Sequence, residues 1–113
     1  MARSLAENRF VELEEITSIA RTLGSPRVCE FTLNAVRELV DEVLVVDDAA
    51  TFHALEFLLE RTKLLTEPAA ACTLVAADRQ RASFAPGEKI VLLLCGGNVA
   101  LADLVEYRKR FAQ

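Results

Sequence analysis

The stretch that decides the fold is Ile90-Val91-Leu92-Leu93-Leu94-Cys95-Gly96-Gly97-Asn98, an apolar run followed by two glycines and an asparagine. Continuous rather than alternating apolarity predicts a strand of a parallel sheet that is covered on both faces. The residues after Cys95 predict a tight turn, because glycine accepts backbone angles that other residues avoid. Ligands of open α/β sheets bind at the carboxyl ends of strands, so Cys95 to Asn98 is a candidate binding turn. A plain structural turn is the alternative, since a phosphate cradle normally has more glycines and a lysine or hydroxyl residue.

The chain on either side of this stretch alternates between helix and strand patterns. Val43–Val46 predicts a second buried strand, and Asp47 or Asp48 predicts the N-cap of the next helix. Apolar spacing, Pro68 in a first turn and runs of small residues predict the helical segments. These are the end of a helix within Arg3–Arg9, then Val28–Val40, a helix with apolar positions from Phe52 to Leu65, Ala69 to Arg81, and Leu101–Phe111.

The order of these elements is that of an α/β protein. Two strands are few, because sheets usually hold four to six, and buried parallel strands have edges that something else must cover. The sequence therefore predicts that residues 1–113 form a single incomplete α/β domain, part of a larger one with a mostly parallel sheet.

Composition narrows the function classes. The 113 residues are 52% hydrophobic and 27% charged, which predicts one globular domain. No apolar run is long enough for a bilayer span, and no basic segment precedes an apolar one at the N-terminus, so we expect no membrane partner and no signal peptide. Three cysteines without C-x-x-C spacing favour a reducing, cytoplasmic location over a disulfide framework or zinc site.

The charged residues indicate structure rather than a charged ligand. The net charge is −4, and the only dense basic cluster, Arg108-Lys109-Arg110, fits the last turn of a helix better than a nucleic-acid patch. His53 is predicted on a helix surface without a role. An acid before Pro68, here Glu67, is usually a partner of the helix dipole.

Four stretches in this order resemble a known family. They are Thr17-Ser18-Ile19-Ala20, Arg37-Glu38-Leu39-Val40-Asp41-Glu42-Val43, Lys63 to Ala71 with Glu67-Pro68, and Cys95-Gly96-Gly97-Asn98. Together they are similar to the C-terminal third of the serine/threonine dehydratases, or threonine deaminases. These are pyridoxal-phosphate enzymes of the tryptophan-synthase-β fold type (fold type II). The resemblance extends from about Ser4 to Phe111 and implies the C-terminal part of a three-layer αβα domain.

The resemblance also implies roles for particular residues. Cys95 would donate a hydrogen bond to the pyridine nitrogen of pyridoxal 5'-phosphate, with Gly96 and Gly97 beside the ring and Asn98 shaping the turn. A thiol is a weak neutral donor, so it does not force that nitrogen to stay protonated. Glu67 would lie near the cofactor. The backbone carbonyls of Leu23 and Ser25 would contribute to a monovalent-cation site.

The departures from the family limit what the chain can do alone. The three lysines, Lys63, Lys89 and Lys109, lack the S-x-K-x-R-like context of the family's Schiff-base lysine, and the phosphate-binding and substrate-carboxylate loops are absent. We therefore expect no catalytic residue in this chain, and no activity by the chain alone. Its expected partners are the N-terminal portion of the same enzyme, in the same or a separate chain, an amino-acid substrate, and further copies in a homo-oligomer.

Three functions remain open from the sequence. The first is a portion of a threonine or serine dehydratase (an ammonia-lyase that gives a 2-oxo acid), with a racemase or related lyase as variants. The second is a non-catalytic remnant or interaction module that pairs with another subunit. The third, an independent small-ligand domain, requires a complete sheet that two strands hardly provide.

Overall fold

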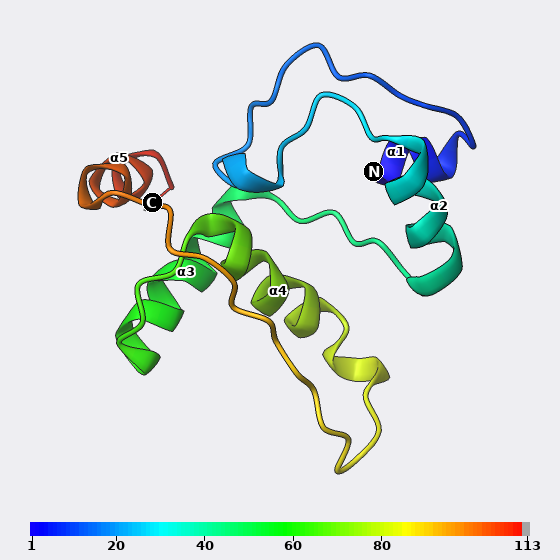
Figure 1. Ribbon diagram of the computed structural model, residues 1–113. Coiled ribbons are helices and arrows are strands. Elements are labelled where there is room, and N and C mark those ends of the chain that lie inside the picture. Colours follow the sequence, from blue (N-terminus) through cyan, green and yellow to red (C-terminus); the bar gives the residue numbers. More distant parts are fainter. Residues whose placement is uncertain (112–113) are drawn as a thin grey trace.

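Helices are the regular structure of the chain within residues 1–111, which the computed structural model describes (Figure 1). The α-helices are α1 (Ala2–Ala6), α2 (Glu30–Leu39), α3 (Asp48–Thr62), α4 (Pro68–Arg79) and α5 (Leu101–Phe111), and the 3-10 turns are η1 (Arg21–Leu23) and η2 (Arg81–Ser83). Each predicted helical segment overlaps one of these α-helices, so the helix predictions are confirmed with shifts of a few residues at the ends.

Helix ends follow the local signals in the sequence. Asp47 is the N-cap of α3, and its Oδ1 accepts a hydrogen bond from the Ala50 amide at 2.8 Å. Helix α3 ends at Lys63, which adopts the left-handed conformation with φ 62°. Helix α4 begins at Pro68, whose missing N–H would be unpaired in a first turn anyway. It ends two residues before the predicted Arg81, where the chain continues as η2.

The two predicted strands do not form a sheet within residues 1–111, which corrects that expectation for the chain by itself. Residues 43–46 and 90–95 have no strand assignment and share no backbone hydrogen bond in this part of the protein. A strand needs the N–H and C=O groups of a neighbour, and neither segment supplies them to the other. The parallel sheet is therefore not a property of these residues alone.

Both segments nevertheless bury one face and expose the other. Val46 and Leu94 pack against a core cluster formed by α3 and α4. Their neighbours point away from it: Val45 is 72% exposed, Val91 88% and Leu93 72%. In the second segment the exposed Val91 and Leu93 alternate with the half-buried Leu92 and Leu94, which is typical of a strand covered by helices on one side. The uncovered side is apolar and has no partner within the described residues.

Two small cores hold the helices together. The first lies between α3 and α4 and comprises Ala54, Leu55, Leu58, Ala71 and Val75. The second joins α5 to α3 and to the loop before η1, through Tyr107, Phe52 and Ile19. The rings of Phe52 and Tyr107 meet edge to face with centroids 6.4 Å apart, a favourable aromatic geometry. Arg108 also pairs with Glu56 of α3, so part of the basic cluster is engaged within the fold.

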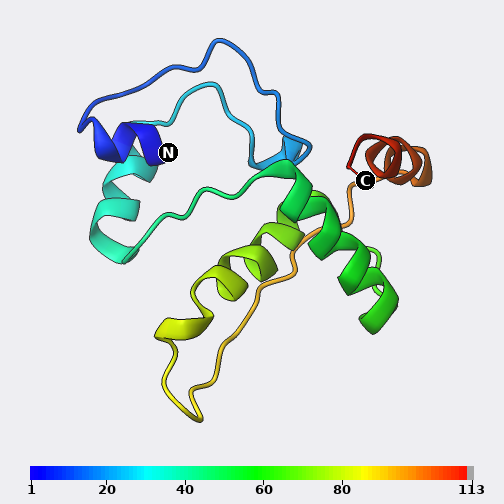
Figure 2. The same cartoon turned by 180° about the vertical axis from the view of Figure 1, so that it is seen from behind.

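The molecule is more open than a compact domain of its length. Helices α1 and α2 lie together, away from α3, α4 and α5, and residues 88–97 run alongside α4 (Figures 1 and 2). The radius of gyration is 15.3 Å, whereas a compact domain of about this size has about 13 Å. The accessible surface is 8305 Å², against roughly 6,100 Å² for a folded monomer of this mass.

We predict that Asp47→Asn makes the stability of the chain less sensitive to acid. The Ala50 amide, and then Arg79, hold the pKa of Asp47 below its ordinary value. A lowered pKa stabilises the fold above the unfolded value, and this contribution is lost as pH falls through the folded value. Wild type should therefore melt at a higher temperature than the variant at pH 7. The gap should close below about pH 4; a gap that stays constant with pH would contradict the assignment.

Candidate functional site

A buried carboxylate, Glu67, lies at the centre of the candidate site. Glu67 is 7% exposed and precedes α4, but its side chain makes no capping hydrogen bond to that helix. Instead, Oε2 accepts a hydrogen bond from the Asn98 amide at 3.1 Å, and the Glu67 amide donates to the Gly96 carbonyl at 3.2 Å. The structure thus brings together residues that lie about thirty positions apart in the sequence.

The glycine turn lies directly over this carboxylate. Gly96 has φ +90°, and a Cβ there would come within 2.6 Å of Glu67 Oε1. A Cβ on Gly97 would lie 3.2 Å from the Leu65 carbonyl. Because neither glycine has a side chain, the turn can approach residues 65–67 closely. The predicted place of both glycines beside a cofactor ring stays a prediction. Asn98 acts through its backbone amide and not through its side chain, which the sequence did not indicate.

The turn η1 and the loop before it complete the surroundings of Glu67. Thr22 Oγ1 donates to Glu67 Oε1 at 2.9 Å. Asp48 holds this loop, because its carboxylate accepts hydrogen bonds from Ser18 Oγ at 2.6 Å and from the Ile19 amide at 3.2 Å. The stretch Thr17-Ser18-Ile19-Ala20 therefore anchors the loop to the first turn of α3.

Thr22, Asp48 and Tyr107 are site residues that sequence reasoning missed. Together with Arg21, Asn98 and others, Thr22, Glu67 and Tyr107 line a cavity of about 130 Å³. Burial raises the pKa of the Tyr107 phenol. Asp48 could have been found from the sequence, because it is a second carboxylate directly after the N-cap Asp47. Nothing in the sequence singled out Thr22 or Tyr107.

The three cysteines occupy different environments, and none forms a disulfide. Cys95 is exposed at the end of the extended segment, immediately before the glycine turn. Cys29 is exposed, and its hydrogen bond with Thr32 lowers the pKa of its thiol. Cys72 is half-buried in α4, and burial raises the pKa of its thiol. Because the thiolate is the reactive form, Cys29 should react readily with alkylating reagents and Cys72 slowly.

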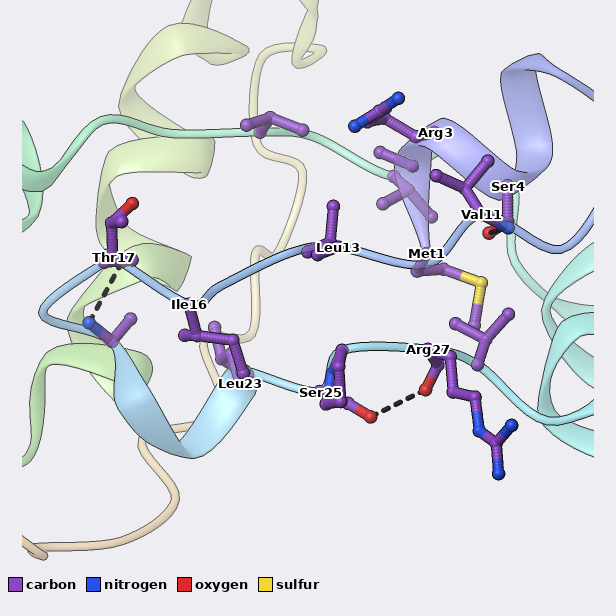
Figure 3. Close-up of a pocket in the computed structure, with 18 of the residues that line it drawn as sticks. Met1, Arg3, Ser4, Val11, Leu13, Ile16, Thr17, Leu23, Ser25 and Arg27 are labelled. Carbon is purple, nitrogen blue, oxygen red and sulfur yellow. Dashed lines mark hydrogen bonds between the residues drawn. The ribbon is translucent and has the colours of Figure 1, made fainter.

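Leu23 and Ser25 do not line the cavity beside Glu67 and Asn98. They line a larger, mostly apolar cavity of about 410 Å³ between the N-terminal segments and residues 43–46 (Figure 3). Ser25 Oγ donates to the Arg27 carbonyl at 2.6 Å, and the Leu13 amide donates to the Pro26 carbonyl at 2.7 Å, so two runs of chain pair across this loop. The described residues contain no cluster of three His, Cys, Asp or Glu suited to a metal ion.

An unpaired hydroxyl lies next to Glu67. Thr66 is 5% exposed, and its Oγ1 has no hydrogen-bond partner among the described residues. Buried polar groups in folded proteins almost always have a partner. This indicates that a further group hydrogen-bonds to the Thr66 hydroxyl. That group would be bound beside the turn or contributed by another part of the protein.

Comparisons with known proteins identify the family. The model of the family described as "Pyridoxal-phosphate dependent enzyme" matches residues 1–96. The chain is 34% identical to a serine racemase of Oryza sativa subsp. indica over 109 residues, which cover 93% of this chain and 32% of the racemase. It is 35% identical to an L-threonine ammonia-lyase of Geobacter sulfurreducens over 96 residues, 85% of this chain and 24% of the lyase.

A solved structure agrees with these matches. The crystal structure of a T.th. threonine deaminase superposes with a TM-score of 0.78 and 33% identity, over 88% of this chain and 36% of the deaminase. The chain therefore belongs to the family of pyridoxal-phosphate dependent enzymes, and pyridoxal phosphate is the cofactor of that family. It spans about a quarter to a third of the length of these curated relatives. Within residues 1–111, no helix is long and apolar enough to cross a bilayer.

We predict that Gly96→Ala destabilises the protein more than Gly87→Ala does. Both glycines have positive φ, +90° and +83°, so alanine is strained at either position by about 1–2 kcal/mol. Only the Cβ at Gly96 meets a neighbour, the Glu67 carboxylate, whereas nothing lies within 4 Å at Gly87. Thermal melts of the two variants should therefore show the larger loss for Gly96→Ala. Equal losses would mean that the turn does not press on Glu67.

Proposed function

We propose that this chain is the C-terminal portion of a pyridoxal-phosphate dependent ammonia-lyase that releases a 2-oxo acid and ammonia from L-threonine or L-serine. The observation that most supports the proposal is that Glu67 is hydrogen-bonded to the glycine turn, and that this turn directly follows the exposed Cys95. The names of the relatives, which include L-threonine ammonia-lyase and threonine deaminase, favour this reaction class. The same residues suit a serine racemase, which the match to the rice protein favours as a second candidate.

The residues around the turn fit the cofactor. Cys95 is exposed and would donate a hydrogen bond from its thiol to the pyridine nitrogen. Gly96, Gly97 and Asn98 are exposed and have little bulk above the turn, which leaves room for the edge of an aromatic ring. When bound, pyridoxal phosphate supplies an electron sink for the negative charge that develops at the substrate α-carbon. Glu67 would keep the turn in place beneath it.

No residue of this chain is proposed as catalytic. Lys63 follows α3, is exposed, and donates from Nζ to the Glu60 carbonyl, while Lys89 and Lys109 are exposed as well. A lysine that binds the cofactor would come from the N-terminal portion of the enzyme, in the same or a separate chain. Leu23 and Ser25 would offer carbonyl oxygens to a monovalent cation only when that portion supplies the other ligands.

The exposed apolar faces of the two extended segments support the need for the N-terminal portion of the enzyme. Residues 43–46 and 90–95 each lack a paired strand, and Val45, Val91 and Leu93 are largely exposed. Added strands would satisfy their backbone groups, and a second helical layer would cover these side chains, which gives the three-layer domain. A homo-oligomer of the assembled enzyme is part of the same proposal. A non-catalytic module that pairs with another subunit through these faces is the alternative.

We predict that the 113-residue chain alone releases no 2-oxo acid from serine or threonine when pyridoxal phosphate is added. The reason is that none of its lysines has the sequence context that binds the cofactor. Addition of the lysine-bearing N-terminal portion should produce 2-oxo acid, measured by reduction with a coupled dehydrogenase. Steady turnover by the chain alone would contradict the proposal. A complete protein without turnover or cofactor binding would favour the non-catalytic module.

We predict that pyridoxal phosphate protects Cys95 from alkylation in the complete protein. The ring would cover the Cys95 thiol, while the exposed Cys29 gives an internal reference and the half-buried Cys72 reports unfolding. Peptide mapping by mass spectrometry after brief treatment with iodoacetamide should show roughly tenfold slower labelling of Cys95 when the cofactor is present. Cys29 labelling should not change. Equal labelling of Cys95 with and without cofactor would place the ring elsewhere.

A further inference from the structure

Thr22 provides a contact to the candidate site from a distant part of the chain. It lies in the middle of η1, 45 residues before Glu67, and its Oγ1 donates to Glu67 Oε1 at 2.9 Å. The position of η1 is itself fixed, because Ile19 is buried against Phe52 and Tyr107 and Ser18 is bonded to Asp48. The hydroxyl of Thr22 is therefore presented to Glu67 by an anchored loop.

Glu67 depends on the donors that surround it. Its carboxylate is buried and forms no ion pair with a basic residue of the described part of the chain. A buried carboxylate of this kind is costly unless hydrogen bonds satisfy its oxygens. Thr22 donates to one oxygen and the Asn98 amide to the other. With one donor on each side, the plane of the carboxylate is held in a single orientation.

The orientation of the carboxylate determines where the turn can lie. A Cβ on Gly96 would lie 2.6 Å from Glu67 Oε1, the same oxygen that Thr22 binds, and the Asn98 amide is bonded to Oε2. A rotation of the carboxylate would therefore move Oε2 away from the Asn98 amide and shift Oε1 relative to Gly96. Because Thr22 is exposed, a water molecule could donate to Glu67 in place of the Thr22 hydroxyl. Such a water would not be attached to η1 and so would not fix the orientation of the carboxylate.

We propose that Thr22 is a positioning residue, which holds Glu67 in the orientation that fixes the Gly96–Asn98 turn and, through it, Cys95. Its consequence for the cofactor rests on the proposed function, whereas its effect on the turn does not. Thr22 touches neither cofactor nor substrate in this proposal. It acts by keeping the Asn98 amide bonded to the carboxylate.

The test compares variants that differ by one hydroxyl group. Thr22→Val keeps the branched shape and Thr22→Ala removes the side chain, whereas Thr22→Ser keeps the donor. Thr73→Val is the matched control, because the Thr73 hydroxyl bonds only to the Ala70 carbonyl within α4. Hydrogen exchange of the Asn98 amide in the full chain is the primary readout. We expect the Asn98 amide to exchange roughly tenfold faster in the valine and alanine variants, because its hydrogen bond to a charged group is weakened. In the serine and control variants we expect the same exchange rate as in wild type.

A second readout links the turn to the cofactor. In the complete protein, protection of Cys95 by pyridoxal phosphate should require several-fold more cofactor in Thr22→Val and not in Thr22→Ser. Failure of the cofactor to protect wild-type Cys95 would overturn the proposed contact between Cys95 and the cofactor, while Asn98 exchange would still test Thr22. Unchanged Asn98 exchange in both Thr22→Val and Thr22→Ala would overturn the positioning role. Since Thr22 is exposed, neither substitution leaves a cavity that would unfold the chain.

Discussion

The hydrogen bonds of one buried carboxylate hold the candidate site together. Glu67 has no cationic partner among the described residues, so its oxygens are satisfied by the Thr22 hydroxyl and the Asn98 amide. These donors belong to η1 and to the glycine turn, and Glu67 itself begins α4. The cost of leaving a buried carboxylate unsatisfied couples the three segments. No sheet within residues 1–111 performs this task.

Helix packing brings the carboxylate to that place. The first turns of α4 consist of small residues, and Ala69, Ala70 and Ala71 are all buried. Small side chains allow α4 to lie close to α3, whose own start holds the loop before η1 through Asp48. Glu67 and the loop before η1 are therefore both held in place by α3 and α4. The turn itself remains exposed, which a binding site requires.

The outer faces of the two extended segments are apolar and unpaired within residues 1–111. Leu94 and Val46 meet α3 and α4, while Val45, Val91 and Leu93 point outward. A lone chain does not normally leave strand-like segments both unpaired and apolar on their outer face. The same segments in relatives of this family belong to chains about three to four times as long, judged from the share that this chain covers.

The sequence by itself determined the features that depend on near neighbours. The Asp47 cap, the start of α4 at Pro68 and the last helix could be predicted, because each depends on contacts within about four residues. Residues 43–46 and 90–95 were predicted as strands of a parallel sheet, but they are unpaired within residues 1–111, since a ladder needs a partner strand and not only an apolar run. Glu67 and the glycine turn were recognisable as motifs. Only the tertiary structure joined them, since the Thr22 and Asn98 donors lie 45 and 31 residues away and a buried carboxylate selects its donors by proximity in space.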